Sequence, residues 1–219
     1  MYLIVTRSFP PEVGGMQNLM WGLANELSKH YMIKVFADYQ DNHKIFDEQV
    51  SFSIERVSGI KLLRKYRKAQ LINEFIKINK IEGIIADHWK SLELIKTNKK
   101  KICLIHSKEI NHPFGSSLNT RMNKAFKKAK IIIANSKYTK ELGVNMGLEK
   151  YKIHVINPGT NYPITLNENS KLEAKNIFSS AFPKIITIAR LDKRKSHQNI
   201  LMTIKNLVPT YPDIKYVSV

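Results

Sequence analysis

Short apolar runs alternate along this chain with longer segments that are apolar on one side only. Runs such as Leu3-Ile4-Val5 and Ile131-Ile132-Ile133 are apolar at every position, which is typical of parallel strands buried on both faces. The pattern predicts strands at Tyr2–Thr6, Ile33–Ala37, Phe52–Val57, Gly83–Asp87, Lys101–His106, Ile131–Ala134 and Lys152–Ile156.

The segments between these strands repeat apolar residues at three- and four-residue spacing, which predicts amphipathic helices. We expect helices at Gly15–Lys29, Lys65–Lys80, Ser116–Lys128 and Ser136–Met146, the last with Ser136 as N-cap. Alternating strands and helices are typical of an α/β fold. The fold class that we predict is a Rossmann-like parallel sheet with helices on both faces.

The alternation loosens after Pro163 and then begins again. We expect an N-terminal Rossmann-like domain at 1–163, a linker with a short helix at 164–183, and the start of a second domain at 184–219. The last segment predicts a strand at Lys184–Ala189, a helix at Ser196–Leu207 and a strand at Ile214–Val219. We interpret it as an incomplete second Rossmann-like unit.

Composition narrows the class of protein. A chain of 219 residues with 43% hydrophobic and 25% charged residues has ordinary globular composition, which excludes disorder of the whole chain. One cysteine, Cys103, excludes an intramolecular disulfide and a zinc site built from cysteines. With no apolar run long enough to span a membrane, and no signal-peptide pattern, we expect a cytoplasmic protein.

The net charge of +18 is the unusual number, with 36 basic and 18 acidic residues. It predicts attraction to polyanions, although a lysine-rich coding bias would produce the same balance. Part of the charge is clustered at Lys61, Arg64, Lys65, Arg67 and Lys68, just before an amphipathic segment. This cluster would suit a peripheral contact with an anionic membrane surface, and equally an ordinary helix with a solvated side.

Candidate binding residues follow the predicted strands, because parallel sheets bind ligands at the carboxyl ends of their strands. Gly14 and Gly15 open the first helix, where free backbone N–H groups favour a phosphate. The alternative is a loop that needs a positive φ at one of them. Arg190 and Lys195 lie before a later helix and are candidates for holding a diphosphate, with a solvated basic turn as the alternative.

Two histidines follow strands, His88 and His106. Either could hydrogen-bond a substrate or titrate near neutral pH, and either could be a structural histidine bonded to backbone. No usual metal-ligand spacing is present, so we expect no metal site. The sequence also lacks a nucleophile elbow and the signatures of nucleic-acid-binding folds, so nucleic acid is not an expected partner.

Four stretches in order resemble the group 1 family of glycosyltransferases, which are retaining enzymes with the GT-B fold. They are Phe9-Pro10-Pro11-Glu12-Val13-Gly14-Gly15-Met16-Gln17, Ile131-Ile132-Ile133-Ala134-Asn135-Ser136-Lys137-Tyr138-Thr139, Lys152-Ile153-His154-Val155-Ile156-Asn157-Pro158-Gly159-Thr160-Asn161, and Ile186-Thr187-Ile188-Ala189-Arg190-Leu191-Asp192-Lys193-Arg194-Lys195-Ser196-His197. Together they extend from residue 9 to residue 197 and so cover nearly the whole chain.

The resemblance implies transfer of a sugar from a nucleotide-diphosphate sugar to a glycan or lipid-linked acceptor. It implies retention at the anomeric carbon, with no metal ion and no cofactor beyond the nucleotide sugar. Gly14, Gly15, Arg190 and Lys195 would then bind the donor diphosphate, and His106 would be the catalytic residue near the donor sugar. Asn135 and Ser136 match a signature near the cleft.

The chain departs from the family pattern at Gln17 and Asn161, where Glu and Asp are common. It also ends before the region in which the family grips the donor nucleotide, so we expect weak or no activity from these 219 residues. Two alternatives stay open from the sequence. One is a non-catalytic acceptor- or membrane-binding half that needs a second chain, and the other is a basic nucleic-acid-binding α/β protein.

Overall fold

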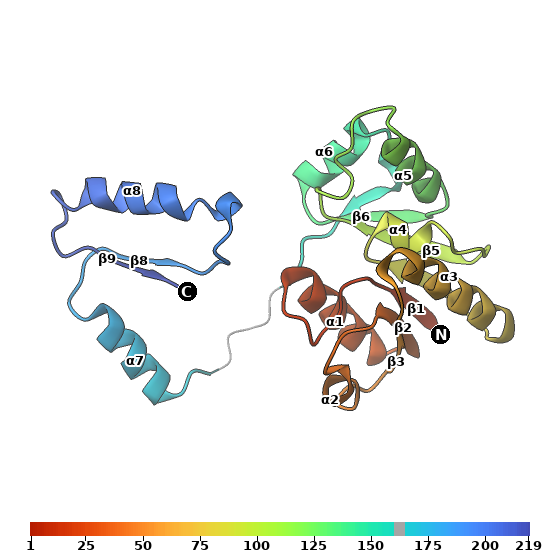
Figure 1. Ribbon diagram of the computed structural model, residues 1–219, viewed down its shortest axis with the longest axis horizontal. Coiled ribbons are helices and arrows are strands. Elements are labelled where there is room, and N and C mark those ends of the chain that lie inside the picture. The colour runs from red at the N-terminus through yellow and green to blue at the C-terminus, as the bar shows by residue number, and fades with distance from the viewer. Residues whose placement is uncertain (160–164) are drawn as a thin grey trace. The chain divides into compact units, whose positions relative to one another are not determined.

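The structure is a computed structural model that describes residues 1–159 and 165–219. It contains two compact units, Met1–Gly159 and Thr160–Val219, and each is described here by itself (Figure 1). The predicted domain boundary at residue 163 and the first linker residue, 164, lie outside the described residues, as does Asn161.

The first unit is built on a seven-stranded sheet in which all neighbouring strands are parallel (Figure 1). The strand order is β3-β2-β1-β4-β5-β6-β7. It reverses direction between β1 and β4, and such a switch point is where open α/β sheets bind ligands. The strands are β1 Tyr2–Val5, β2 Ile33–Asp38, β3 Ser53–Val57, β4 Gly83–Ala86, β5 Lys100–Ile105, β6 Ile131–Ala134 and β7 Ile153–Val155.

Helices cover both faces of this sheet, as predicted. Neighbouring residues of one strand enter different cores: Leu3 and Val5 lie in one buried cluster, and Ile4 lies in the other. The cluster that contains Leu3 packs under α3, α4 and α5, whereas the cluster that contains Ile4 packs under α1. The helices of this unit are α1 Gly15–Ser28, α2 His43–Asp47, α3 Lys61–Ile78, α4 Trp89–Leu92, α5 Ser117–Lys127 and α6 Lys137–Asn145, with a 3₁₀ turn at Lys150–Lys152.

Two short helices and the start of α3 differ from the sequence-based expectation. Helices α2 and α4 have five and four residues, too few to show a helical period. Helix α3 begins at Lys61 rather than Lys65. The apolar pattern missed this first turn because Leu62 and Leu63 face solvent there and do not extend the buried stripe. The seven strands predicted in this unit are confirmed, and their ends differ from the prediction by a few residues.

The second unit contains α7 (Glu168–Phe178), a 3₁₀ turn at Lys193–Lys195, α8 (His197–Leu207) and the parallel strands β8 (Lys184–Thr187) and β9 (Lys215–Ser218). Its strand–helix–strand order is the one predicted. No described residue of this unit is buried, and Ile186 of β8 is 51% exposed. In the described part of the chain, no helix is both long and apolar enough to cross a membrane.

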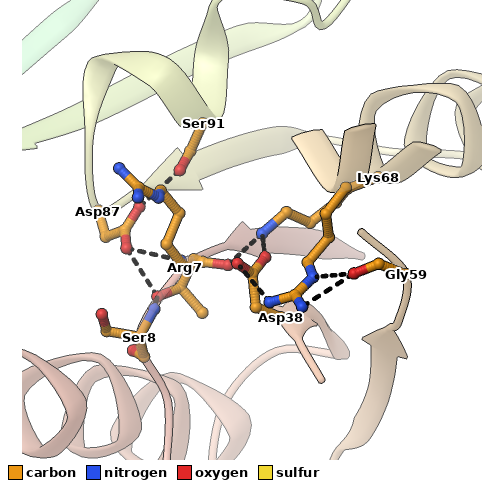
Figure 2. A network of polar contacts seen from close by, with 9 residues as sticks. Arg7, Ser8, Asp38, Gly59, Lys68, Asp87 and Ser91 are labelled. Atoms are coloured by element: carbon orange, nitrogen blue, oxygen red, sulfur yellow. Dashed lines mark hydrogen bonds and ion pairs between the residues drawn. The ribbon is translucent and has the colours of Figure 1, made fainter. Parts of the chain in front are cut away.

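The buried carboxylate of Asp87 joins the two strands at the switch point (Figure 2). Asp87 follows β4 and is 2% exposed. Its Oδ2 accepts hydrogen bonds from the Thr6 hydroxyl and the Arg7 backbone N–H, both at 2.8 Å. Its Oδ1 accepts one from the Ser91 hydroxyl at 2.7 Å. The carboxylate therefore fixes the end of β1 against the start of α4.

His88 caps α4 with its ring. Its Nδ1 accepts a hydrogen bond from the Lys90 backbone N–H at 2.9 Å, so this nitrogen must carry no proton. Burial, and secondarily the charges of Arg7 and Lys90, lower the pKa of His88 from 6.5 to about 3. Of the two roles that the sequence left open for His88, the structure favours the structural one.

Removing the Asp87 carboxylate should destabilise the first unit. Asp87→Ala leaves the Ser91 hydroxyl and the Arg7 backbone N–H without an acceptor, whereas the Thr6 hydroxyl can still donate to the Ser8 carbonyl. We expect a loss of about 2–4 kcal/mol in the free energy of unfolding. The measurement is urea unfolding followed by circular dichroism. Asp87→Asn keeps an acceptor oxygen and should lose less. Equal midpoints for wild type and Asp87→Ala would show that the hydrogen bonds contribute nothing.

The histidine cap should make stability depend on pH. The pKa of His88 is lower in the folded than in the unfolded state, so the unfolded state binds more protons between the two values and stability falls as pH falls. Between about pH 7.5 and about pH 5 the loss should be about 2 kcal/mol. His88→Asn keeps a capping oxygen without titrating and should flatten this dependence. His154→Asn, at an exposed histidine, is the control that should retain it.

Candidate functional site

The residues that end β1, β4, β5 and β6 gather at one edge of the sheet. The parallel register pairs Val5 with Ala86 across β1 and β4, and Ile105 with Ala134 across β5 and β6. The next residues along these strands are Thr6, Asp87, His106 and Asn135. Two of the predicted site residues, His106 and Asn135, therefore follow neighbouring strands.

His106 is half-buried directly after β5, and its backbone N–H donates to Glu109 Oε1 at 2.5 Å. Its ring Nε2 is buried and has no hydrogen-bond partner within the residues that the structure describes. A buried ring nitrogen without a partner costs free energy, which a ligand hydroxyl or phosphate would recover. The ring is therefore available for binding at the sheet edge.

The residue after His106 has an unusual backbone. Ser107 has φ of 97°, in the region that side chains other than glycine rarely adopt. The Ser107 carbonyl accepts hydrogen bonds from the backbone N–H groups of Ile110 and Asn111. This turn holds the strained conformation and fixes where His106 leaves the strand. Such strain often accompanies functional sites, and no pattern in the sequence pointed to Ser107.

Asn135 and Ser136 form the cap of α6. Ser136 Oγ accepts from the Thr139 backbone N–H at 3.1 Å, which confirms it as the N-cap. Asn135 Oδ1 accepts from the Thr139 hydroxyl at 2.7 Å. These side chains are thus occupied in holding the start of α6, and they lie at the same sheet edge as His106.

Gly14 and Gly15 open α1, but neither has a φ in the left-handed region that favours glycine, so the alternative explanation for this pair was wrong. Gly14 is fully extended, with φ of 172°, and it provides no side-chain cap for α1. A Cβ at Gly15 would meet no atom within 4 Å. The fold itself therefore does not require glycine at residue 15, and the first N–H groups of the helix have no capping side chain.

A cavity of about 270 Å³ lies beside the sheet edge on the α3 side. One acidic side chain, Asp38, lines this cavity. The other charged residues of the lining are all cations, so we call the cavity the basic pocket. These cations are Arg7, Lys61, Arg64, Lys65, Lys68, Lys90 and Arg121. Four of these seven belong to the basic cluster seen in the sequence. The other three are distant in sequence, and only the fold brings them to the pocket.

Lys68 is the buried cation of the basic pocket, at 4% exposure (Figure 2). Its Nζ donates to the Thr6 carbonyl at 2.6 Å and pairs with the Asp38 carboxylate. Burial lowers the pKa of Lys68, and the charge of Asp38 partly offsets that effect. Arg64 also pairs with Asp38, at 3.5 Å. The single acid of the pocket is therefore shared between two cations.

The predicted phosphate-binding residues of the second unit surround the start of α8. His197 Nε2 donates to the Arg190 carbonyl oxygen at 3.0 Å, which holds that backbone near the helix. Arg194 pairs with Asp192 at 2.6 Å and holds the pKa of that carboxyl below its usual range. Arg190 and Lys195 make no ion pair among the described residues, and both are exposed.

A cavity of about 330 Å³ lies at the same loop and includes Lys193, which we had not singled out from the sequence. In residues 1–159 and 165–219, no group of three or more histidine, cysteine or acidic side chains could hold a metal ion.

Comparison with protein families matches most of the first unit. A model of Glycosyltransferase Family 4 matches residues 13–162, which contain the strand-edge residues from Gly14 to Ser136. Among curated proteins, none matches the sequence significantly.

Several glycosyltransferase structures share the fold. HepE from Anabaena in complex with UDP has a TM-score of 0.71 and 15% identity, and the match covers 100% of this chain and 69% of that chain. HepE with UDP and glucose has a TM-score of 0.69 and 19% identity, covering 99% and 60%. The second HepE match thus spans less than two thirds of that protein.

Two further enzymes are similar in the same way. Sucrose-phosphate synthase from Thermosynechococcus elongatus has a TM-score of 0.67 and 14% identity, covering 99% of this chain and 70% of that chain. The lipopolysaccharide outer core galactosyltransferase WaaB has a TM-score of 0.61 and 11% identity, covering 100% and 68%. At these identities the structural likeness shows the GT-B fold alone, whereas the family match over residues 13–162 shows that the chain belongs to Glycosyltransferase Family 4.

Proposed function

We propose that this protein transfers a sugar from a nucleotide-diphosphate sugar to an acceptor, with retention at the anomeric carbon and without a metal ion. The observation that carries the proposal is the family match over residues 13–162, which include Asp87, His106 and Asn135 of the strand edge. HepE, which has the same fold, was crystallised with UDP, with glucose and with UDP-glucose. We therefore take UDP-glucose as the donor to test first.

In this proposal the reaction exchanges one bond at the anomeric carbon for another. The bond from that carbon to the donor diphosphate breaks, and a bond to the acceptor hydroxyl oxygen forms on the same face of the sugar. The hydroxyl proton leaves with the departing diphosphate. Negative charge develops on the diphosphate, so cations fixed near it would lower the barrier without a metal ion.

His106 is the residue that we assign to the sugar. Its unpartnered ring Nε2 would hydrogen-bond a sugar hydroxyl at the sheet edge, and the Ser107 turn would keep the ring in place. Positioning of this kind fixes the geometry of the reacting carbon. Asn135 and Ser136 would act indirectly, since their side chains already hold α6.

Arg190 and Lys195 are the residues that we assign to the donor diphosphate. Both are cationic, neither makes an ion pair in the described residues, and they flank the start of a helix without a side-chain cap. Gly14 and Gly15 would let the diphosphate approach the uncapped start of α1. Each of these assignments is a proposal from local geometry within its own unit.

The acceptor that we propose is a glycan or a lipid-linked glycan, and a lipid-linked one would place the protein on the cytoplasmic face of a membrane. These 219 residues match 69% of the HepE chain in one structure and 60% in another, so part of HepE has no counterpart here. We therefore propose slow turnover by this chain. A non-catalytic half would instead bind UDP-glucose and release no UDP.

Replacing His106 should slow turnover without weakening nucleotide binding. We expect His106→Ala to lower the rate of UDP release from UDP-glucose by about 100-fold, since fixed hydrogen-bond donors at reacting groups contribute on that order. The affinity for UDP, measured by calorimetry, should stay the same. His30→Ala, at an exposed histidine, is the control. Unchanged turnover in His106→Ala would remove the role assigned to the ring.

Neutralising the basic pair should weaken UDP binding. We expect Arg190→Gln with Lys195→Gln to raise the Kd for UDP by about tenfold or more, because hydrogen bonds to charged groups contribute about 1.5–3 kcal/mol each. Calorimetric titration with UDP measures the change. Lys184→Gln with Lys205→Gln removes the same charge from β8 and α8 and should leave the Kd near its wild-type value. If both pairs weaken UDP binding equally, the loop has no specific role.

A further inference from the structure

We propose that the basic pocket binds the phosphate group of an anionic lipid that serves as the acceptor. This inference rests on the proposed sugar transfer, and it names the chemical class of the acceptor. It concerns the pocket at the end of β1, beside α3, which the assignments to His106, Arg190 and Lys195 leave unused.

The charge of the pocket is not balanced by the protein. Of its seven cations, Lys68 and Arg64 share Asp38, and Arg121 pairs with Glu93 at 2.8 Å. The remaining four form no ion pair within the described residues, and they are Arg7, Lys61, Lys65 and Lys90. Four cations held around one cavity repel each other, so a bound anion would offset a cost that the empty pocket carries.

Lys90 lines the pocket together with Arg7 and Arg121. Its pKa is lowered, first by burial and then by the charges of Arg7 and Arg121. Lys90 comes from α4 and Arg121 from α5, whereas Arg7 follows β1. Residues of three separate parts of the fold thus bring positive charge to one cavity. An ordinary solvated helix side, which was the alternative interpretation of the basic cluster, does not explain cations that converge from different elements.

The start of α3 adds a second unfavourable arrangement. Its N-cap residue, Ile60, provides no side-chain hydrogen bond, and the first turn contains no acidic residue. Lys61, Arg64 and Lys65 instead lie near the positive end of the helix dipole, where cations are disfavoured and anions are favoured. A phosphate at this end would complement both the dipole and the side chains.

The size of the cavity favours a small anionic group. At about 270 Å³ it lies just below the usual range for sites of drug-sized ligands, so it suits a phosphate or diphosphate better than a whole nucleotide sugar. Arg7 connects the pocket to the proposed sugar site. Arg7 follows Thr6 at the end of β1, and His106 follows β5, which is separated from β1 in the sheet only by β4. A phosphate in the pocket would therefore hold the attached acceptor at the same sheet edge as His106.

Exposed apolar side chains beside the pocket indicate that the phosphate is attached to a hydrocarbon chain. Ile60, Leu62 and Leu63 are 71%, 81% and 60% exposed, and Tyr66 is 53% exposed. Leu62 also lines the pocket. These residues alternate with Lys61, Arg64 and Lys65 over two helical turns. Apolar and cationic side chains mixed in this way are typical of helices that lie at a lipid interface.

The experiment measures binding of the 219-residue chain to vesicles, with inorganic pyrophosphate as the free anion. Three vesicle types are compared: phosphatidylcholine alone, phosphatidylcholine with phosphatidylglycerol, and phosphatidylcholine with phosphatidic acid at the same surface charge. We expect tighter binding to phosphatidic acid, whose terminal phosphate can enter the pocket, than to phosphatidylglycerol. Pyrophosphate should compete with the phosphatidic acid vesicles.

Two matched variants locate the binding on α3. Lys61→Gln with Lys65→Gln should weaken binding to phosphatidic acid vesicles by about tenfold or more, taking the usual contribution of a lysine near an anionic surface. Lys77→Gln with Lys80→Gln removes the same charge from the other end of the helix and its flank, outside the pocket. It should change binding by less than about twofold. Leu62→Ser with Leu63→Ser should weaken vesicle binding but leave the affinity for pyrophosphate unchanged.

Some outcomes would overturn the proposal. Equal binding to both anionic lipids, or equal losses in the two lysine pairs, would mean attraction by diffuse charge. Binding of single-stranded RNA should also be measured. If RNA binds more tightly than phosphatidic acid vesicles, and the Lys61/Lys65 variant weakens that binding, the pocket belongs to nucleic acid instead. Because this binding needs no turnover, lipid binding without His106-dependent UDP release would refute the proposed function alone. UDP release without lipid binding would refute the pocket alone.

Discussion

The buried Asp87 carboxylate is the interaction on which the ligand-binding edge of the first unit depends. It accepts hydrogen bonds from both the end of β1 and the start of α4, at the point where the strand order reverses. At such a switch point the connections that follow the two neighbouring strands run to opposite sides of the sheet, and the backbone groups at the strand ends need partners. Asp87 provides the partners there, so Arg7 and His88 leave the sheet from fixed positions.

The fixed position of β1 also determines where the positive charge gathers. The hydroxyl of Thr6 donates a hydrogen bond to the Asp87 carboxylate. Lys68 of α3 donates a hydrogen bond to the carbonyl of the same Thr6 (Figure 2). This contact draws the basic first turns of α3 toward the sheet edge, beside Arg7. The basic pocket is thus a consequence of the same strand end. The buried contacts of Lys68 fix α3 there, and the unpaired Lys61 and Lys65 of the same helix line the pocket with Arg7.

Sequence reasoning could predict the sheet, because strands buried on both faces require apolar residues at every position. Leu3, Ile4 and Val5 satisfy both cores, and their pattern has no other simple explanation. The helix cap at Ser136 was readable for a similar reason, since capping depends on a residue and its near neighbours. Local chemistry and burial leave clear signals along the chain.

The basic pocket could be predicted only in part. Lys61, Arg64, Lys65 and Lys68 are close in sequence, so their clustering was visible, whereas Arg7, Lys90 and Arg121 join them only through the fold. The strain at Ser107 has no residue pattern at all, because it is imposed by the turn that follows β5. Long-range convergence and imposed strain depend on tertiary structure, which no local pattern of residues records.

The strand edge and the basic pocket together suggest how one side of the sheet could bring the donor sugar and the acceptor together. The unpartnered nitrogen of His106 suits a neutral hydroxyl, because it offers a single hydrogen bond. The unpaired cations around Arg7 suit a phosphate, because only an anion relieves their repulsion. A donor sugar held at His106 and an acceptor held by its phosphate in the pocket would lie at the same sheet edge, and holding both there would orient the acceptor hydroxyl for transfer.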